Sequence, residues 1–213
     1  MAGKALQVGI LALQGAVEPH VRALKQLGVD AVQVRKSNHL LGLSGLILPG
    51  GESSAMIHLL NLNQLWEPLR DFAAVKPVWG VCAGAILLAR EVTHPSQVSL
   101  EALDITVSRN AYGRQIDSFT APLVPTEHWL GQSLEGVFIR APRITSFGPS
   151  IKVLFTYNGE AVMVEDGKKM ASTFHPELTE NAAVHEYFVG KCTSEKTPWM
   201  TDFQSTYVSP SVN

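Results

Sequence analysis

A cysteine between two glycines is the residue of this sequence best suited to covalent chemistry. Cys82 stands in the pattern Gly-x-Cys-x-Gly (80–84), the thiol counterpart of the Gly-x-Ser-x-Gly nucleophile elbow. Such a sharp strand-to-helix turn lifts the sulfur above the carboxyl edge of a sheet. It also places the sulfur at a helix N-terminus, where the helix dipole favours the thiolate. The N–H of Ala83 would then point to where an oxyanion forms. The alternative is that Cys82 is a small buried hydrophobic residue, as most lone cysteines are.

A histidine and a glutamate that could activate this thiol stand together later in the chain. His175, Pro176 and Glu177 follow the apolar run 170–174. A histidine that takes a proton from a thiol needs a partner that fixes its tautomer and orientation, and Glu177 is the obvious candidate. Without an elbow cysteine, a solvated turn before a helix would be the better interpretation. With Cys82 in the same chain, the three residues predict acyl transfer through a thioester.

A glycine pair could supply hydrogen-bond donors for such a reaction. Gly50 and Gly51 are followed by Glu52 and Ser53, after a short apolar run that suits a strand. Glycine allows backbone torsions that other residues resist, so these N–H groups could bind an oxyanion or a carboxylate. An ordinary strand-to-helix turn is the alternative. The position at a carboxyl edge, one strand–helix unit before Cys82, favours a site.

Other polar residues are less distinctive. Arg109 and Arg140 each end an expected strand and could pair with a carboxylate, although a single arginine is more often a surface charge. The acidic residues and cysteines show no spacing for a metal site. The six remaining histidines lack a neighbouring carboxylate turn and are interpreted as having no role in a site: His20, His39, His58, His94, His128 and His185.

The elements expected around these residues predict an α/β protein. Strands are expected at 5–13, 29–34, 45–48 and 77–81, and helices at 18–26, 54–60, 65–74 and 83–90. This alternation favours a doubly wound parallel sheet. After Glu91 the pattern changes to short strands at 103–109, 116–123, 137–139, 151–157, 161–164 and 170–174, and to a helix at 179–188. The second half therefore adds mixed or antiparallel strands to the parallel sheet.

Composition and charge exclude several classes of protein. The chain has 213 residues, of which 46% are hydrophobic, and a net charge of −2, which gives no indication of a nucleic-acid or membrane partner. Two cysteines argue against a disulfide framework and indicate a reducing compartment. With no secretory signal pattern and no apolar run long enough to cross a bilayer, we expect a cytoplasmic protein. We expect one domain in residues 1–192 and a polar C-terminal tail in residues 193–213.

The combined motifs resemble a known family. GVCAGAILLA (80–89) and FHPELTE (174–180) are similar to the elbow and the His–Glu turn of class I, triad-type glutamine amidotransferases. Four further segments resemble, more narrowly, the glutaminase subunits of pyridoxal 5′-phosphate synthase: LALQGAVEPH (11–20), LPGGESSAM (48–56), SRNAYGRQIDSF (108–119) and GVFIRAP (136–142). The resemblance spans residues 5–192 in order. It implies a three-layer fold whose mostly parallel central sheet is flanked by helices and carries added antiparallel strands.

The resemblance also implies roles for particular residues. Cys82 would attack the side-chain amide of L-glutamine, His175 would activate the thiol and protonate the departing ammonia, and Glu177 would orient His175. The thioester would then be hydrolysed to L-glutamate. The residues implied to hold glutamine are Gly51, Glu52, Ser53, Arg109, Ile139 and Arg140. Those implied to form the oxyanion hole are Gly50, Gly51 and Ala83.

A partner is implied in the same way. In relatives the glycine loop becomes competent when the synthase subunit docks, and segment 13–17 would lie at that interface, near the path of ammonia. The synthase would combine ammonia with ribose 5-phosphate and glyceraldehyde 3-phosphate. Pyridoxal phosphate is then a product of the complex, and no cofactor is expected in this chain. Glu18-Pro19 departs from the usual residues before His20.

Three other interpretations fit parts of the pattern. A glutaminase serving another synthase, such as imidazole glycerol phosphate synthase, or a γ-glutamyl hydrolase would share the elbow and the His–x–Glu turn. Either should lack the GRQIDSF and VFIRAP segments in this arrangement. A catalytically silent regulatory subunit on the same fold is the second, although all three triad residue types are present. In the third, Cys82 is a core residue, and its replacement by alanine would leave activity intact.

Overall fold

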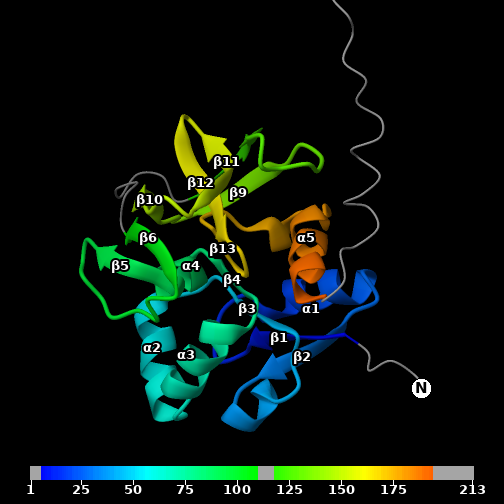
Figure 1. The fold of residues 1–213 in the computed structure, drawn as a ribbon, viewed down its shortest axis with the longest axis vertical. Coiled ribbons are helices and arrows are strands. Elements are labelled where there is room, and N and C mark those ends of the chain that lie inside the picture. The colour runs from blue at the N-terminus through cyan, green and yellow to red at the C-terminus, as the bar shows by residue number, and fades with distance from the viewer. Residues whose placement is uncertain (1–5, 110–117, 194–213) are drawn as a thin grey trace, which may run out of the picture.

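An eight-stranded sheet lies at the centre of the protein (Figure 1). The structure, a computed structural model, describes residues 6–109 and 118–193. The strand order is β2-β1-β3-β4-β13-β12-β11-β8, and the first five strands in this order run parallel. The last three are added antiparallel. The strands are β1 (Gln7–Leu11), β2 (Asp30–Val34), β3 (Gly45–Leu48), β4 (Val78–Val81), β8 (Val124–Pro125), β11 (Lys152–Tyr157), β12 (Glu160–Asp166) and β13 (Lys169–Ser172).

Helices cover both faces of this sheet. On one face lie α1 (Val17–Gln26) and α5 (Ala183–Cys192), and on the other α2 (Ser53–Leu62), α3 (Trp66–Val75) and α4 (Ala83–Leu88). Strand β3 shows why two cores form, because successive side chains of a strand point to opposite faces. Leu46 and Leu48 pack in the cluster beneath α2–α4, whereas Ile47 packs in the cluster beneath α1 and α5. The predicted three-layer α/β fold is confirmed.

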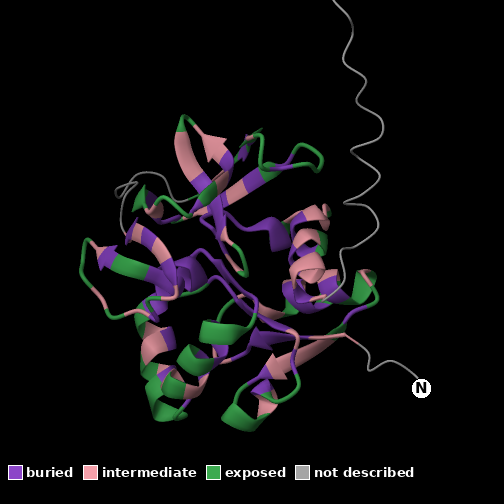
Figure 2. Cartoon of the chain, viewed as in Figure 1, coloured by how far each residue is buried: buried purple, intermediate pink, exposed green. Residues whose placement is uncertain are grey.

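Figure 2 shows that buried residues concentrate in the central strands, while the outer surfaces of α2 and α3 are exposed. Two short 3₁₀ helices complete the helical elements in the described ranges, η1 (Ser37–Leu40) and η2 (Pro176–Leu178). None of the helices there has the length and apolar character that crossing a membrane requires.

Two smaller sheets flank the carboxyl edge of the parallel strands. One consists of β5 (Ala89–Thr93), β6 (Leu103–Ser108) and β10 (Arg143–Phe147), and the other pairs β7 (Ser118–Pro122) with β9 (Glu135–Ile139). The expected strands of the second half are therefore present, and the start of the one predicted at 116–123 lies outside the described residues. The predicted tail also lies outside them from residue 194 onward.

Several predicted helix ends are wrong: the helix predicted at 54–60 runs from Ser53 to Leu62, and two further ends have a clear structural reason. The helix predicted at 83–90 ends at Leu88, because residues 89–93 continue as β5 and pair with β6. The helix predicted at 179–188 begins at Ala183. The Thr179 hydroxyl donates to the carbonyl of Pro176 at 2.9 Å and closes the η2 turn, so Thr179 caps no helix. Asn181 Oδ1 accepts the N–H of Ala183 at the true start.

Candidate active site

Cys82 has the strained backbone expected of a nucleophile elbow. Its φ is 49° and its ψ is −101°, at the junction of β4 and α4. A non-glycine residue in such a conformation costs about 1–3 kcal/mol and persists only where the surroundings enforce it. The flanking glycines allow the close packing that does so. A Cβ on Gly80 would overlap the carbonyl of Gly84, and one on Gly84 would overlap the carbonyl of Leu48.

His175 and Glu177 form a hydrogen-bonded pair beside the elbow. His175 Nδ1 lies 2.8 Å from Glu177 Oε1, and the backbone N–H of His175 donates to the carbonyl of Val137 in β9. The Glu177 side chain is fully buried. Because Nδ1 is occupied by Glu177, Nε2 remains for proton exchange, and it has no other hydrogen-bond partner in the described part of the chain.

The environment of His175 favours its charged form. Burial alone would lower the pKa of the ring, but contacts with Cys82 and Glu177 outweigh that effect and raise the pKa to about 10. These contacts therefore favour the imidazolium form of His175. A cationic ring beside a sulfur stabilises the thiolate, which is the nucleophilic form of cysteine.

A cavity of about 450 Å³ brings the predicted residues together. Glu177 is the exception, since it lies buried behind His175. The predicted residues that line the cavity are Gly50, Gly51, Glu52, Ser53, Cys82, Ala83, Arg109, Ile139, Arg140 and His175. Those lining it that the sequence did not assign to the site are Gln14, Gly15, Ala16, Ile86 and Leu178.

The glycine loop is held from two sides. A Cβ on Gly50 would overlap the ring of His175, so only glycine fits there without moving the imidazole. The carbonyl of Gly50 accepts a hydrogen bond of 3.1 Å from the N–H of Ala16. Because the peptide group is planar, this bond also fixes the direction of the N–H of Gly51. The oxyanion role of this loop and of Ala83 stays a prediction.

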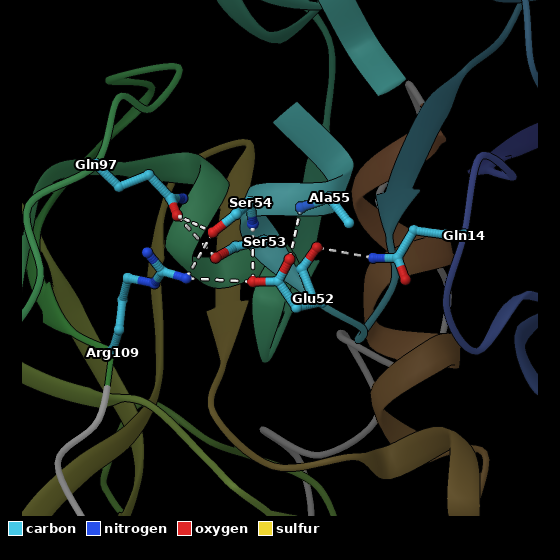
Figure 3. Close-up of polar contacts among 7 residues, drawn as sticks. All are labelled: Gln14, Glu52, Ser53, Ser54, Ala55, Gln97 and Arg109. Atoms are coloured by element: carbon cyan, nitrogen blue, oxygen red, sulfur yellow. Dashed lines mark hydrogen bonds and ion pairs between the residues drawn. The ribbon is translucent and has the colours of Figure 1, made fainter. Parts of the chain in front are cut away.

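Arg109 is anchored at the cavity wall by two neighbours. Its Nη2 lies 3.2 Å from Glu52 Oε1 and 2.9 Å from Ser54 Oγ (Figure 3). Both contacts use one nitrogen, and a guanidinium has five N–H donors, so others remain for a carboxylate. This arrangement suits the α-carboxylate of an amino acid.

The Glu52 carboxylate caps helix α2. It accepts hydrogen bonds from the backbone N–H groups of Ser54 (3.0 Å) and Ala55 (2.6 Å). Partial burial would raise the pKa of Glu52, but these bonds and the charge of Arg109 outweigh it and lower the pKa below its usual value. Glu52 is thus an ionised anchor for Arg109 and for the start of α2.

Two glutamines also hold this wall, and sequence reasoning missed both. Gln97 Oε1 accepts from Ser53 Oγ at 3.0 Å and Ser54 Oγ at 3.4 Å, and Gln14 Nε2 donates to the carbonyl of Glu52 at 2.9 Å. Figure 3 shows Gln97 and Gln14 approaching from opposite sides. Gln97 follows β5 and is 44 residues from Ser53, so no local pattern could have indicated the contact.

The end of β9 faces the sulfur. Cys82 Sγ lies 3.9 Å from the carbonyl oxygen of Ile139, and Arg140 follows with a φ of 44°. This positive φ is uncommon for a residue other than glycine. It turns the chain at the point where Ile139 and Arg140 line the cavity.

Cys82, and not Cys192, is expected to be the reactive thiol. Cys82 lines the cavity, whereas Cys192, the last residue of α5, does not. Burial raises the pKa of the Cys192 thiol to about 12, although the charge of Lys191 opposes this. Iodoacetamide at pH 7 should therefore alkylate Cys82 at least about tenfold faster, as measured by peptide mass spectrometry. The Cys192→Ala variant should still be labelled at Cys82, and the Cys82→Ala variant should lose this rapid labelling. Faster labelling of Cys192 than of Cys82 would contradict the assignment of Cys82 as the reactive thiol.

Comparison with known proteins shows that the chain is similar to glutamine amidotransferases. The model of the SNO glutamine amidotransferase family matches residues 10–194. Deinococcus radiodurans pyridoxal 5′-phosphate synthase subunit PdxT is 52% identical over 87% of this chain and 96% of the relative. The Geobacillus thermodenitrificans subunit of the same name is 45% identical over 90% of this chain and 98% of the relative.

Solved structures of glutamine amidotransferases have the same fold as this chain. A crystal structure of a glutamine amidotransferase, 44% identical, superposes with a TM-score of 0.81 and covers 87% of this chain and 98% of its own. PurLQS from Thermotoga maritima is 16% identical, with a TM-score of 0.63 over 89% of this chain and 95% of its own, and shows the same fold. The chain belongs to the SNO glutamine amidotransferase family.

Proposed function

We propose that this chain hydrolyses L-glutamine to L-glutamate and ammonia, as the glutaminase subunit of pyridoxal 5′-phosphate synthase. The ammonia passes to the synthase subunit, which uses it with ribose 5-phosphate and glyceraldehyde 3-phosphate. The observation that carries the proposal is the single cavity in which an elbow cysteine meets the histidine of a buried His–Glu pair. The similarity to relatives named pyridoxal 5′-phosphate synthase subunit PdxT supports the synthase as the partner of this chain.

In the proposed mechanism, the Cys82 thiolate attacks the side-chain amide carbon of glutamine. The developing oxyanion is stabilised by the N–H of Ala83 and by a backbone N–H of the Gly50–Gly51 loop. His175 then gives its proton to the departing nitrogen, and the C–N bond breaks to leave ammonia and a thioester. In the second half, His175 takes a proton from water and the hydroxide attacks the thioester carbon. The C–S bond then breaks, which releases glutamate and restores the Cys82 thiolate beside a protonated His175. Glu177 keeps the ring oriented in both halves.

We propose that glutamine is held by its α-carboxylate and α-amino groups. Arg109 and Arg140, both lining the cavity, suit the carboxylate. The other groups proposed to contact the substrate lie on the same wall and at the end of β9: Gly51, Glu52, Ser53 and Ile139.

Docking of the synthase at segment 13–17 is proposed to control the glycine loop. The hydrogen bond from Ala16 to Gly50 supports this, because it joins that segment directly to the loop. A partner that moved Ala16 would free the Gly50–Gly51 peptide group to turn. We further propose that residues 1–192 form the glutaminase domain and that the protein acts in the cytoplasm, where its two cysteines would stay reduced.

Ammonia release from glutamine tests the proposed function. The chain should release little ammonia alone and should be strongly activated by a purified pyridoxal phosphate synthase subunit, because docking completes the oxyanion hole. A glutamate dehydrogenase-coupled assay measures both rates. Equal rates with and without the synthase would contradict both the control of the glycine loop by docking and the synthase as the partner. No ammonia release under either condition would favour a catalytically silent subunit.

A further inference from the structure

Two histidines that the proposed mechanism does not use lie buried behind Glu177. His20 of α1 is 0% exposed and His185 of α5 is 1% exposed. His20 Nδ1 lies 2.9 Å from His185 Nε2, and His20 Nε2 lies 3.9 Å from Glu177 Oε1. The same Glu177 oxygen binds His175 Nδ1. A continuous line of polar groups therefore runs from His175 through Glu177 and His20 to His185.

We propose that His20 is a positioning residue for Glu177 and that His185 in turn fixes the tautomer of His20. The proposal deepens the proposed glutaminase function and rests on it. A fully buried carboxylate needs N–H groups around it to offset the loss of water. Glu177 Oε2 has no hydrogen-bond partner in the described ranges, and the ion-pair contacts of Glu177 there are with His175 and His20.

Electrostatics selects one tautomer of the histidine pair. Burial, and then the neighbouring rings of His185 and His175, lower the pKa of His20 well below its usual value, and burial lowers that of His185 to about 4. Both rings are therefore neutral at pH 7, and one hydrogen lies between His20 and His185. If this hydrogen were on His20 Nδ1, the Nε2 atom of His20 would carry none and would direct a lone pair at the Glu177 carboxylate. If His185 supplies it, His20 Nε2 carries a hydrogen and directs an N–H at Glu177, which the carboxylate favours.

The separation of 3.9 Å defines how His20 acts. It exceeds the 2.7–3.2 Å of a hydrogen bond, so the N–H acts on Glu177 as an oriented dipole. Dipoles act strongly in the weakly polar interior. The edge-on ring of Trp79 holds both histidines, with centroids 5.5 Å from His20 and 4.9 Å from His185. The pair therefore cannot rotate away from Glu177 without repacking this core.

Helix α1 and the residue before it each contact the site at one point. Ala16, the residue before it, holds the carbonyl of Gly50, and His20, within its first turns, faces Glu177. A substitution at His20 should therefore affect the chemical step more than substrate binding, because neither His20 nor His185 lines the cavity.

Steady-state glutamine hydrolysis by the full chain, assembled with its synthase, tests the proposal. His20→Leu removes the N–H and should lower kcat by about 10- to 100-fold while KM stays within about threefold. His20→Gln places an amide N–H near the position of Nε2 and should recover most of that loss. Leu24→Ala is the matched control, because Leu24 is also fully buried on α1 but is not part of this polar line. It should lower thermal stability and keep kcat near the wild-type value.

The outcomes separate the two proposals. Provided that the wild type releases ammonia, any one of three results overturns the positioning role. The first is a kcat of His20→Leu within threefold of wild type. The others are a loss of kcat in Leu24→Ala as large as in His20→Leu, and no recovery of kcat in His20→Gln. If wild type releases none, the glutaminase function itself fails and this role with it. Should His20→Leu not fold, His185→Phe serves instead, since it keeps an aromatic ring against Trp79 and removes the hydrogen that sets the tautomer. A kcat decrease in that variant, smaller than about 100-fold and at unchanged KM, supports the proposal, and an unchanged kcat overturns it.

Discussion

Replacing Cys82 by alanine is expected to abolish ammonia release from glutamine. The variant cannot form the thioester, and losses of about 10⁴-fold or more in kcat are typical when a nucleophile is removed. Alanine is smaller and keeps the same backbone, so the elbow should remain, with a change in unfolding free energy within about 1 kcal/mol. Coupled ammonia assays of the complex give the rate, and thermal unfolding gives the stability.

A second cysteine provides the matched control for this variant. Cys192, the last residue of α5, is buried outside the cavity, so Cys192→Ala should lower thermal stability and leave kcat near that of wild type. Binding of the synthase should survive in both variants. Retained turnover in Cys82→Ala would sink the assignment of the nucleophile and restore the view of Cys82 as an ordinary core residue.

Replacing His175 by asparagine is the second change expected to abolish turnover. Asparagine places an amide N–H near the position of Nδ1, so the contact with Glu177 can persist while Nε2, the proton-transferring atom, is lost. We expect kcat to fall by about 10³-fold or more. Single-turnover measurements should show that no thioester accumulates, and an unchanged rate would exclude His175 as the acid and base.

The neighbouring variant Glu177→Gln should be less severe, because orienting groups are often only partly required. It removes the negative charge that helps to raise the pKa of His175, so this pKa should fall from about 10 toward its ordinary value. The sign follows from the charge: a carboxylate stabilises the imidazolium, and a neutral amide does not. Titration of the His175 ring by NMR measures this pKa. An unchanged pKa in Glu177→Gln would show that Glu177 does not cause the raised pKa of His175.

Sequence reasoning could single out Cys82, His175 and Glu177 as candidates because their signals are local. A Gly-x-Cys-x-Gly turn between a strand and a helix, and a His-Pro-Glu turn after a strand, each specify their geometry within a few residues. The observed φ of 49° at Cys82 and the 2.8 Å contact between His175 and Glu177 agree with them. Helix ends were harder to predict, since pairing with β6 ended α4 at Leu88, two residues before the predicted end.

The groups around these residues are set by contacts between distant segments. His20 and His185 lie 165 residues apart and meet only when α1 and α5 pack on the same face of the sheet. Gln97 reaches Ser53 from the strand-to-strand connection after β5. A lone histidine or glutamine has no sequence pattern that distinguishes such a role from an exposed position.

The sequence by itself determined the α/β class, the elbow, the His–Glu turn and the glycine pair, because hydrophobic periodicity and turn chemistry act over short stretches of chain. Only the tertiary structure decided that these parts share one cavity with Arg109 and the end of β9, and that Ala16 holds Gly50. It also decided that two histidines stand buried behind Glu177. The physical reason is that burial and charge interactions depend on which elements pack together, and that packing is a property of the whole fold.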